Sequence, residues 1–280
     1  MESLRDDRMT RFNAQAIRTA VLNMAYHGAT VHVGCAFSIV ELLAVLYRRH
    51  LRIDPADPRW PGRDYLVLSK GHGVMAQYAC LNELGWISDE DMARYFQNGT
   101  RLKGLADAHV PGVEASTGSL GHGMSVAAGL ALAAQLNASD QMCYVLVGDG
   151  ELNEGPIWEA ALFASHFKLD KLVVIVDKNG FQAMGSTDEV MALGNIEEKF
   201  RAFGFDAVTI DGHDEVAIDA AYAQARTARN GRPKAIVATT TKGKGVSFME
   251  GDNIWHYTRL TQDTHCAALA EVAQTNTGVL

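Results

Sequence analysis

Residues 142–150 read MCYVLVGDG, and residues 172–179 read LVVIVDKN. Each segment is a short, continuously apolar run that ends in glycine or polar side chains. Similar apolar runs, and helical patterns between them, occur at residues 65–68, 207–210 and 235–240 (strands) and 157–167, 196–203 and 215–228 (helices). Apolar strands that alternate with helices indicate a parallel sheet with helices on both faces. The sequence therefore predicts an α/β fold whose ligands bind beyond the carboxyl ends of the strands.

The flanking segments extend this prediction to a single domain over residues 1–280. Residues 1–60 are expected to be mainly helical, because residues 11–24 repeat apolar side chains at helical spacing. Ser38 and Glu41 have the spacing of a capping box, and Ser88 opens another short helix in the same way. Residues 261–280 are expected to form a polar tail, with a helix over 266–273 and fraying beyond it.

The composition excludes several classes of protein. Of the 280 residues, 48% are hydrophobic and 21% charged, which excludes an intrinsically disordered chain. The net charge of −8, without a basic stripe, argues against nucleic-acid binding. The longest apolar run, residues 126–136, is too short to cross a membrane, and the N-terminus is no signal peptide. Four widely spaced cysteines argue against a disulfide or zinc scaffold and favour a cytoplasmic protein.

Oxygen-bearing side chains follow two successive strands of the predicted sheet. Asp149 follows the first strand, and Asn179 lies 30 residues on, after the second. Carboxylate and amide oxygens suit Mg²⁺ or Ca²⁺, and Gly150 lets a backbone N–H approach phosphate groups. A Rossmann dinucleotide site is the competing interpretation, but the next glycine after Gly150 is Gly155, which is the wrong spacing.

Several histidines lie in short loops rich in glycine. His72 is flanked by two glycines, the loop 118–123 reads GSLGHG, and His32 and His256 occupy two further polar segments. A lone histidine is more often structural than catalytic. The flanking glycines favour a ligand site, because they allow a backbone to press against a ligand. Imidazoles there could recognise phosphates and hydroxyls or move protons near neutral pH.

Together these motifs resemble those of a known family. Gly-Asp-Gly followed by Asn about 30 residues on is the thiamine diphosphate fingerprint. The chain resembles the diphosphate-binding half of transketolases, and in particular the N-terminal subunits of split transketolases. The similarity covers about residues 10–260, and the matching segments are His32–Gly34, Leu68–Gly73, Pro111–Gly123, Gly148–Gly155, Asp177–Asn179 and Lys242–Gly245.

The resemblance implies a role for each matching residue. The metal ligands are Asp149, Asn179 and the carbonyl of Phe181, with Mg²⁺ or Ca²⁺ as the ion. The catalytic set is His32, which binds the sugar and relays protons, with His72 and His109. Glu154 and Glu159 meet the partner half, although acidic residues early in a helix are also common for electrostatic reasons. The cofactor-binding set is His72, Gly118, Leu120, Gly150, Glu151, Asn179 and His256.

The sequence departs from the family pattern at one place. Transketolases usually carry Gly-His-Pro shortly before the segment that starts here at Pro111. In this chain Gly104 and Leu105 stand at the expected His-Pro, and the nearest histidine is His109. Either His109 takes over the contact with the donor's first hydroxyl, or it is a loop residue without such a role.

The resemblance also implies a partner. Thiamine diphosphate reacts through its C2 carbanion, which in transketolases needs a glutamate from a second α/β domain. Only 40 residues follow Thr240. We therefore expect a C-terminal, pyrimidine-binding subunit in an α₂β₂ assembly, and ketol transfer from a ketose or ketose phosphate to an aldose. The alternatives are a subunit of a thiamine diphosphate decarboxylase that forms acyl or acyloin products, and a catalytically silent regulatory homologue.

Overall fold

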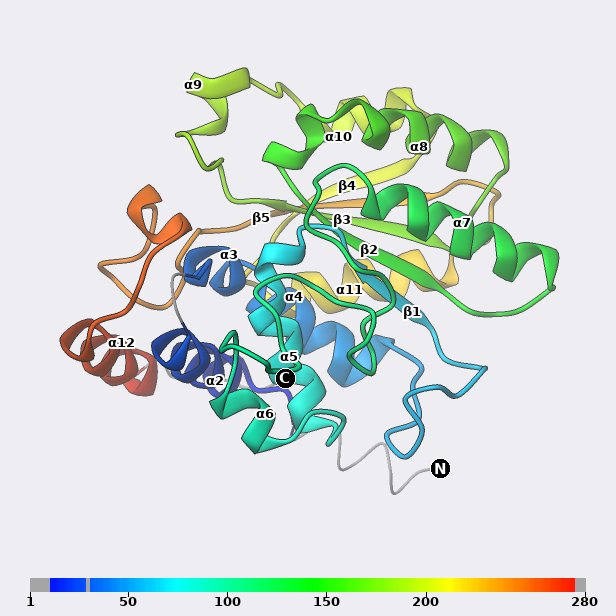
Figure 1. The fold of residues 1–280 in the computed structure, drawn as a ribbon. Coiled ribbons are helices and arrows are strands. Elements are labelled where there is room, and N and C mark those ends of the chain that lie inside the picture. Colours follow the sequence, from blue (N-terminus) through cyan, green and yellow to red (C-terminus); the bar gives the residue numbers. More distant parts are fainter. Residues whose placement is uncertain (1–10, 29–30, 275–280) are drawn as a thin grey trace.

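The computed structural model describes residues 11–28 and 31–274, and its centre is a five-stranded parallel sheet (Figure 1). The strand order is β1-β2-β3-β5-β4. The strands are β1 (Tyr65–Leu68), β2 (Cys143–Gly148), β3 (Leu172–Lys178), β4 (Asp206–Asp211) and β5 (Lys234–Thr239). All five strands predicted from the apolar runs are present, and the α/β fold with a parallel sheet is confirmed.

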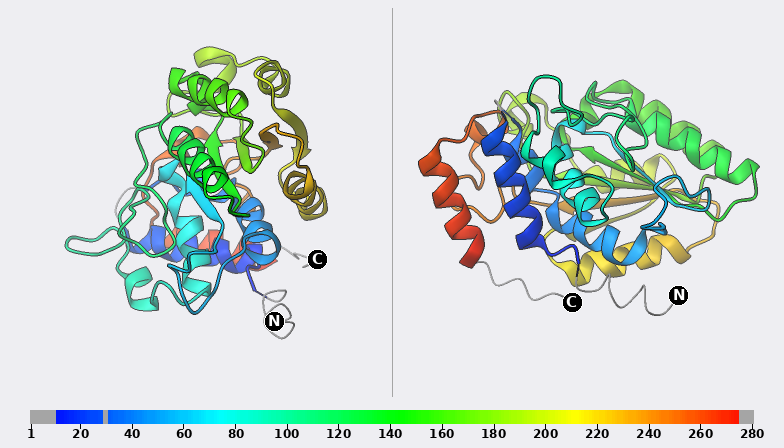
Figure 2. Two further views of the ribbon diagram at one scale, coloured as in Figure 1. Left: turned by 90° about the vertical axis from the view of Figure 1, so that its right-hand side faces the viewer. Right: turned by 60° about the horizontal axis from the view of Figure 1, so that its bottom comes forward.

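Helices cover both faces of the sheet (Figures 1 and 2). One face carries α7 (Gly123–Leu136), α8 (Gly155–His166) and α10 (Ile196–Ala202), which bury an apolar cluster with Val145, Val174 and Val237. The opposite face packs on a larger cluster that includes Leu146, Ile175 and Ile236. Its helices are α2 (Ala14–His27), α3 (Val33–Phe37), α4 (Val40–Val45), η1 (Leu46–His50), α5 (Val74–Glu83) and α11 (Glu215–Thr227).

The short elements lie mainly in the connections. They are η2 (Gly71–Gly73), α6 (Asp89–Ala93), η3 (Gly150–Asn153), α9 (Thr187–Met191) and η4 (Asn253–His256). Ser88 caps α6 as predicted, since its side chain accepts a hydrogen bond from the N–H of Asp91. Within the described part of the chain, no helix is long and apolar enough to cross a membrane.

The last helix packs against the first described one. The helix expected over 266–273 is α12, which runs from Gln262 to Gln274 and lies beside α2 (Figure 2). His265 stacks on Tyr26 with ring centroids 4.4 Å apart, and its Nε2 lies 3.1 Å from Asn23 Oδ1. Residues 275–280, where fraying was expected, lie outside the described residues.

The predicted capping box at Ser38 is wrong. Helix α4 starts after Ile39, and no side chain caps it. Ser38 instead donates a hydrogen bond to Asp177 Oδ2 at 2.7 Å. Glu41 is buried in an ion pair with Arg18, with Oε1 and Nη1 2.7 Å apart, and it accepts a hydrogen bond from His213 Nδ1 at 3.0 Å. Both side chains therefore serve contacts between distant segments, which a local pattern cannot reveal.

The Glu41 cluster predicts how stability depends on pH. Burial alone would raise the pKa of Glu41, but Arg18 and the hydrogen bonds of His213 and Arg18 lower it from 4.5 to about 2. A carboxyl whose pKa falls on folding stabilises the protein above its unfolded-state pKa. We expect Glu41→Gln to reduce the free energy of unfolding by about 3 kcal/mol at pH 7. This difference should narrow as the pH falls from 4.5 towards 2.

Urea unfolding at a series of pH values measures this difference. Glu90→Gln is the matched control, because Glu90 lies on the surface and its nearest cation, Arg94, is 4.0 Å away. The control should show no pH-dependent loss. A Glu41→Gln difference that stays constant from pH 7 to pH 3 would show that the carboxylate charge is not what stabilises the fold.

Candidate active site

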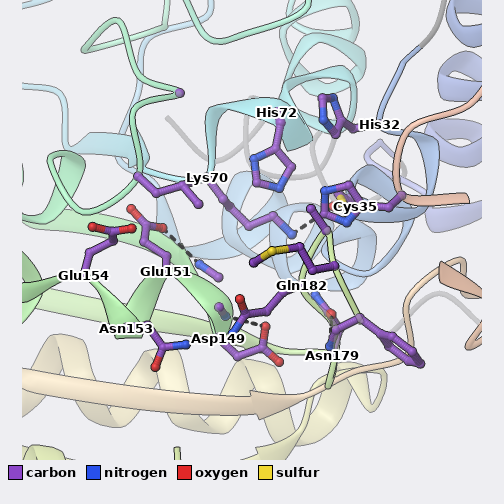
Figure 3. Close-up of a pocket in the computed structure, with 18 of the residues that line it drawn as sticks. His32, Cys35, Lys70, His72, Asp149, Glu151, Asn153, Glu154, Asn179 and Gln182 are labelled. Carbon is purple, nitrogen blue, oxygen red and sulfur yellow. Dashed lines mark hydrogen bonds between the residues drawn. The ribbon is translucent and has the colours of Figure 1, made fainter. Parts of the chain in front are cut away.

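A pocket of about 440 Å³ lies at the carboxyl ends of β1, β2 and β3 (Figure 3). The strand register places its polar residues together, since Gly148 pairs with Asp177 and Lys178 pairs with Thr239. The pocket brings together most of the site residues expected from the sequence: His32, His72, Gly118, Leu120, Asp149, Gly150, Glu151, Glu154, Asn179, Phe181 and His256.

A buried ion pair forms the floor of this site. Lys70 follows β1 and Asp177 lies in β3, and their side chains are 1% and 0% exposed. Lys70 Nζ donates to Asp177 Oδ2 and, at 3.0 Å, to the carbonyl of Cys35. Burial alone would raise the pKa of Asp177, but Lys70 and hydrogen bonds from Thr240 and Ser38 lower it. The carboxylate is therefore ionised and binds four neighbouring side chains.

The fourth neighbour of Asp177 is Asn179, and this contact orients the Asn179 amide. Asn179 Nδ2 donates to Asp177 Oδ2 at 2.8 Å, which fixes which end of the amide is nitrogen. Its Oδ1 accepts the N–H of Phe181 at 3.1 Å and keeps a second lone pair. Asn179 thus presents an oxygen, as a ligand of a hard cation must.

Asp149 supplies the negative charge beside Asn179. Its Oδ1 accepts the N–H of Gly150 at 2.8 Å and its Oδ2 accepts the N–H of Gly180 at 2.6 Å, so the carboxylate links the ends of β2 and β3. Burial, followed by the charge of Asp177, raises its pKa to about 6. A buried carboxylate held at this cost fits a site that receives a cation. The donor set therefore fits a divalent metal ion.

Glu151 ties three segments of the pocket wall together. Its carboxylate accepts hydrogen bonds from the Ser69 hydroxyl, from the N–H of Gly121 at 2.8 Å and from the N–H of Gly148 at 3.1 Å. Burial raises its pKa. These partners make Glu151 a residue that positions the loops around the pocket.

The glycine-rich loops press against each other and not only against a ligand, as the sequence argument assumed. A Cβ on Gly71 would lie 2.6 Å from the carbonyl oxygen of Thr117, and one on Gly123 would lie 2.6 Å from Ser69 Cβ. Contacts this short do not occur for real side chains. The loop after β1 and the loop 118–123 can therefore close together only because these positions carry glycine.

Three histidines line one wall of the pocket. The ring of His32 lies 5.0 Å from His72 and 5.4 Å from His256, measured between centroids. Burial and the charge of Lys242 lower the pKa of His32 to about 4 and that of His256 to about 3. Burial and Lys70 lower the pKa of His72 as well. All three rings are neutral at pH 7, so each offers one N–H donor and one lone pair.

Several site residues were not assigned a role from the sequence. Lys70, Asp177 and Lys242 lie inside quoted motifs, which was the available signal, while Cys35 and Gln182 carried none. Lys242 Nζ donates to His256 Nδ1 at 2.6 Å and to Asn253 Oδ1 at 3.0 Å. Gln182 lines the pocket, and its buried Nε2 has no hydrogen-bond partner. The pocket therefore contains two cations and an unused amide donor.

Two of the expected site residues lie outside the pocket. The His109 side chain is 92% exposed, and its Nδ1 lies 2.7 Å from Asp107 Oδ1. Glu159 is exposed on α8. Leu105 does line the pocket and lies against Gly118. An apolar side chain therefore lies at the pocket, in the stretch where the resemblance leads one to expect an imidazole.

Comparisons with known proteins identify the family. The family model described as transketolase, thiamine diphosphate binding domain, matches residues 9–275. The chain belongs to the transketolase family. As its thiamine-diphosphate-binding part, the chain is a transferase component, and thiamine diphosphate is the cofactor of this domain. The resemblance inferred from the motifs is thereby confirmed.

Relatives of similar length are named as subunits. The 6-deoxy-6-sulfo-D-fructose transketolase subunit SqwG of Clostridium sp. (strain MSTE9) is 44% identical over 92% of this chain and 94% of its own. A subunit of the apulose-4-phosphate transketolase of Actinobacillus succinogenes is 42% identical over 87% of this chain and 88% of its own. These two transketolase subunits differ in the sugar that their names give.

Solved transketolases share the fold over a longer chain. The enzyme from Leishmania mexicana superposes with a TM-score of 0.87 at 34% identity, and that from Campylobacter jejuni with 0.88 at 30% identity. The matches cover 93% and 95% of this chain. They cover only 40% and 43% of the solved chains, so this chain corresponds to less than half of those enzymes.

Proposed function

We propose that this chain and a C-terminal partner subunit form a transketolase that moves a two-carbon ketol unit from a ketose or ketose phosphate to an aldose. One observation carries the proposal: in a transketolase domain, Asp149 and Asn179 meet His72 and His256 in a single pocket at the carboxyl edge of the sheet. When bound, thiamine diphosphate supplies a nucleophilic carbon that accepts the ketol unit. The residues of this chain bind and orient the cofactor and the sugar.

A divalent cation, Mg²⁺ or Ca²⁺, would bind Asp149, the Asn179 amide oxygen and the carbonyl of Phe181. The raised pKa of Asp149 supports this assignment, because a cation would relieve the cost of the buried charge. The hydrogen bond from Asn179 to Asp177 supports it as well, because it leaves the amide oxygen available. Such an ion holds diphosphate oxygens beside the protein ligands.

The diphosphate would lie between this ion and the histidine wall. Neutral His72 and His256 each have an N–H to donate, and the N–H of Gly150 lies at the same edge. The buried ammonium groups of Lys70 and Lys242 supply positive potential beneath the phosphates. Gly118 and Leu120, on the opposite wall of the pocket, would contact the aminopyrimidine. The unpartnered Gln182 amide gives this wall a further donor.

His32 is the residue best placed to contact the sugar. Its ring stands beside His72 and His256, and also 4.6 Å from Tyr257, measured between centroids. A neutral imidazole can donate to one substrate hydroxyl and accept from another, or move a proton between them. We assign His32 and His72 to these contacts with the reacting groups.

The partner subunit would cover the pocket from the side of Glu154. Glu154 lines the pocket and is exposed, and Glu159 lies exposed on the helix that follows. Near-full-length relatives that are named as subunits support a two-component enzyme. An α₂β₂ assembly is the expected arrangement, since two-fold symmetry is the commonest closed form.

Metal-dependent cofactor binding tests the site. With the partner present, calorimetry should detect thiamine diphosphate binding that requires Mg²⁺ or Ca²⁺. Asp149→Ala should weaken it by about 100-fold or more, because it removes the charged member of the three proposed ligands. Asp211→Ala is the matched control, since Asp211 ends the strand β4 outside this pocket. Equal affinity in the Asp149 variant and the control would refute the metal assignment.

Reconstitution tests the assembly. The purified chain should show no ketol transfer alone and should gain it on adding a C-terminal transketolase subunit, with light scattering giving two copies of each. At limiting partner concentration Glu154→Ala should lower activity, whereas Glu90→Ala on α6 should not. Full turnover by this chain without a partner contradicts the two-component proposal.

The third test concerns the donor and distinguishes Leu105 from His109. Leu105 cannot hydrogen-bond a hydroxyl, and His109 lies outside the pocket, so we expect modest discrimination between a hydroxyketone donor and its deoxy analogue. Leu105→His should raise the ratio of the two kcat/KM values by about tenfold, the effect of one hydrogen bond. His109→Ala should leave it unchanged. A loss of tenfold or more in the His109 variant would instead assign His109 to the donor hydroxyl.

A further inference from the structure

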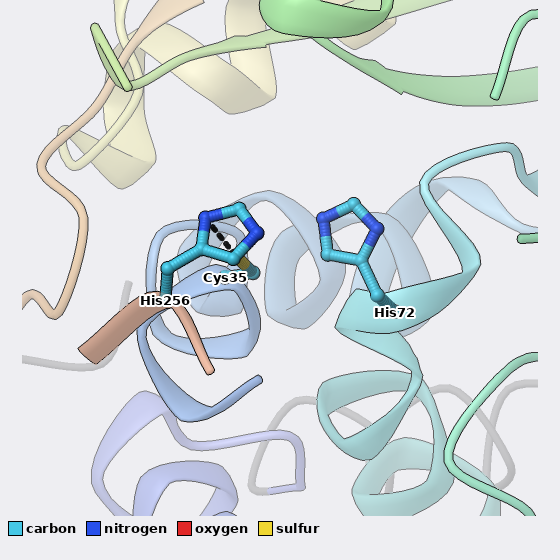
Figure 4. A group of neighbouring side chains, drawn as sticks. All are labelled: Cys35, His72 and His256. Atoms are coloured by element: carbon cyan, nitrogen blue, oxygen red, sulfur yellow. Dashed lines mark hydrogen bonds between the residues drawn. The ribbon is translucent and has the colours of Figure 1, made fainter. Parts of the chain in front are cut away.

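Cys35, His72 and His256 form a compact cluster that the proposed function leaves partly unused (Figure 4). They come from α3, η2 and η4, three segments far apart in the sequence. One ligand atom from each lies within 4.8 Å of the other two. We propose that these three side chains form a binding site for a borderline-soft divalent ion such as Zn²⁺, separate from the oxygen ligands Asp149 and Asn179.

The geometry is close to that of a tetrahedral metal site. Zinc binds imidazole nitrogen at about 2.0–2.1 Å and thiolate sulfur at about 2.3 Å, which places its ligand atoms roughly 3.3–3.7 Å apart. Cys35 Sγ already lies 3.8 Å from His256 Nδ1. The remaining distances need a contraction of about 1 Å, which small changes in the side-chain torsions supply. Three protein ligands with a fourth position open to the pocket is a known zinc arrangement.

The ligand types also separate this site from the proposed magnesium site. Two imidazoles and a thiol suit zinc, whereas hard ions prefer oxygen. Both histidines have pKa values lowered by burial and by nearby lysines, so their lone pairs are free of protons at pH 7. Burial raises the pKa of the Cys35 thiol. A bound metal ion removes that proton directly, so metal binding releases one proton to solvent.

Neighbouring charges set how tightly the ion binds. The charged groups acting on Cys35 are Lys70 and Lys242 on one side and Asp149 and Asp177 on the other. Two cations and two carboxylates balance, and the thiolate then favours a cation. The ion must also displace Lys242 from His256 Nδ1, but Lys242 keeps its contact with Asn253. We therefore expect weaker binding than at a dedicated structural zinc site.

Zinc and the cofactor would compete for the same histidines. This step rests on the proposed function, in which His72 and His256 hold the diphosphate, whereas metal binding itself does not. A metal ion on these rings occupies the lone pairs and the space that the phosphates need. The cofactor-free chain would be open to zinc, and the loaded enzyme would be protected. The site would then act as a reversible, metal-dependent brake on cofactor loading.

Cobalt titration tests the metal site alone. Co²⁺ added to the full-length chain without cofactor should give a near-ultraviolet thiolate-to-cobalt absorption band. Cys35→Ala and His72→Gln, which remove ligands from two different elements, should abolish it. Cys266→Ala is the control, because Cys266 is an exposed thiol on α12, and its band should remain. Absence of the band in the wild type, or its survival in Cys35→Ala, overturns the proposal.

Competition tests the brake. Zinc at ten times its own Kd should raise the apparent Kd of thiamine diphosphate with Mg²⁺ by about tenfold in the wild type. In Cys35→Ala zinc should not change the apparent Kd, whatever its starting value, and chelation by the free cofactor affects both proteins equally. A cobalt band without competition keeps the metal site and contradicts the placement of the diphosphate. Competition that persists in Cys35→Ala contradicts the metal site.

Discussion

The ion pair between Lys70 and Asp177 is the interaction on which the geometry of the pocket depends. Both groups are removed from water, which is costly unless each finds partners. Asp177 finds Lys70, Ser38, Asn179 and Thr240, so a single carboxylate joins the ends of three strands to the helical layer. Removing one partner of such a pair leaves an uncompensated charge and typically costs about 3–5 kcal/mol. The orientation of Asn179 is a direct product of this arrangement.

The same pair explains why the histidines are neutral. Lys70 and Lys242 stand close to the rings and oppose any further positive charge. A diphosphate that enters the pocket therefore meets fixed ammonium charges below it and neutral N–H donors beside it. The protein keeps its cations buried and already bonded, so that they need little rearrangement when an anion binds. This matches the cofactor that the family binds.

Much of the fold, and the composition of the pocket, could be predicted from the sequence. Strands such as β2 and β3 are continuous apolar runs, and Asp149 and Asn179 had to meet once their strands were neighbours. Contacts between distant segments could not be predicted. Ser38 and Glu41 matched a local capping pattern but bind Asp177, Arg18 and His213, up to 172 residues away. The spacing of the cysteines argued against a metal site for the same reason, because a pattern along the chain does not show Cys35 beside His256.

The packing of α12 on α2 has a consequence for the order of folding. About 240 residues separate His265 from Asn23, and Arg18 reaches across 226 residues to the carbonyl of Lys244. Loop closure over such distances is slow, and proteins rich in these contacts fold slowly. On the ribosome α2 emerges first and must wait for the last segments to be made before it can bury its apolar face. The chain therefore passes through synthesis with this face exposed, a stage at which chaperones would bind it.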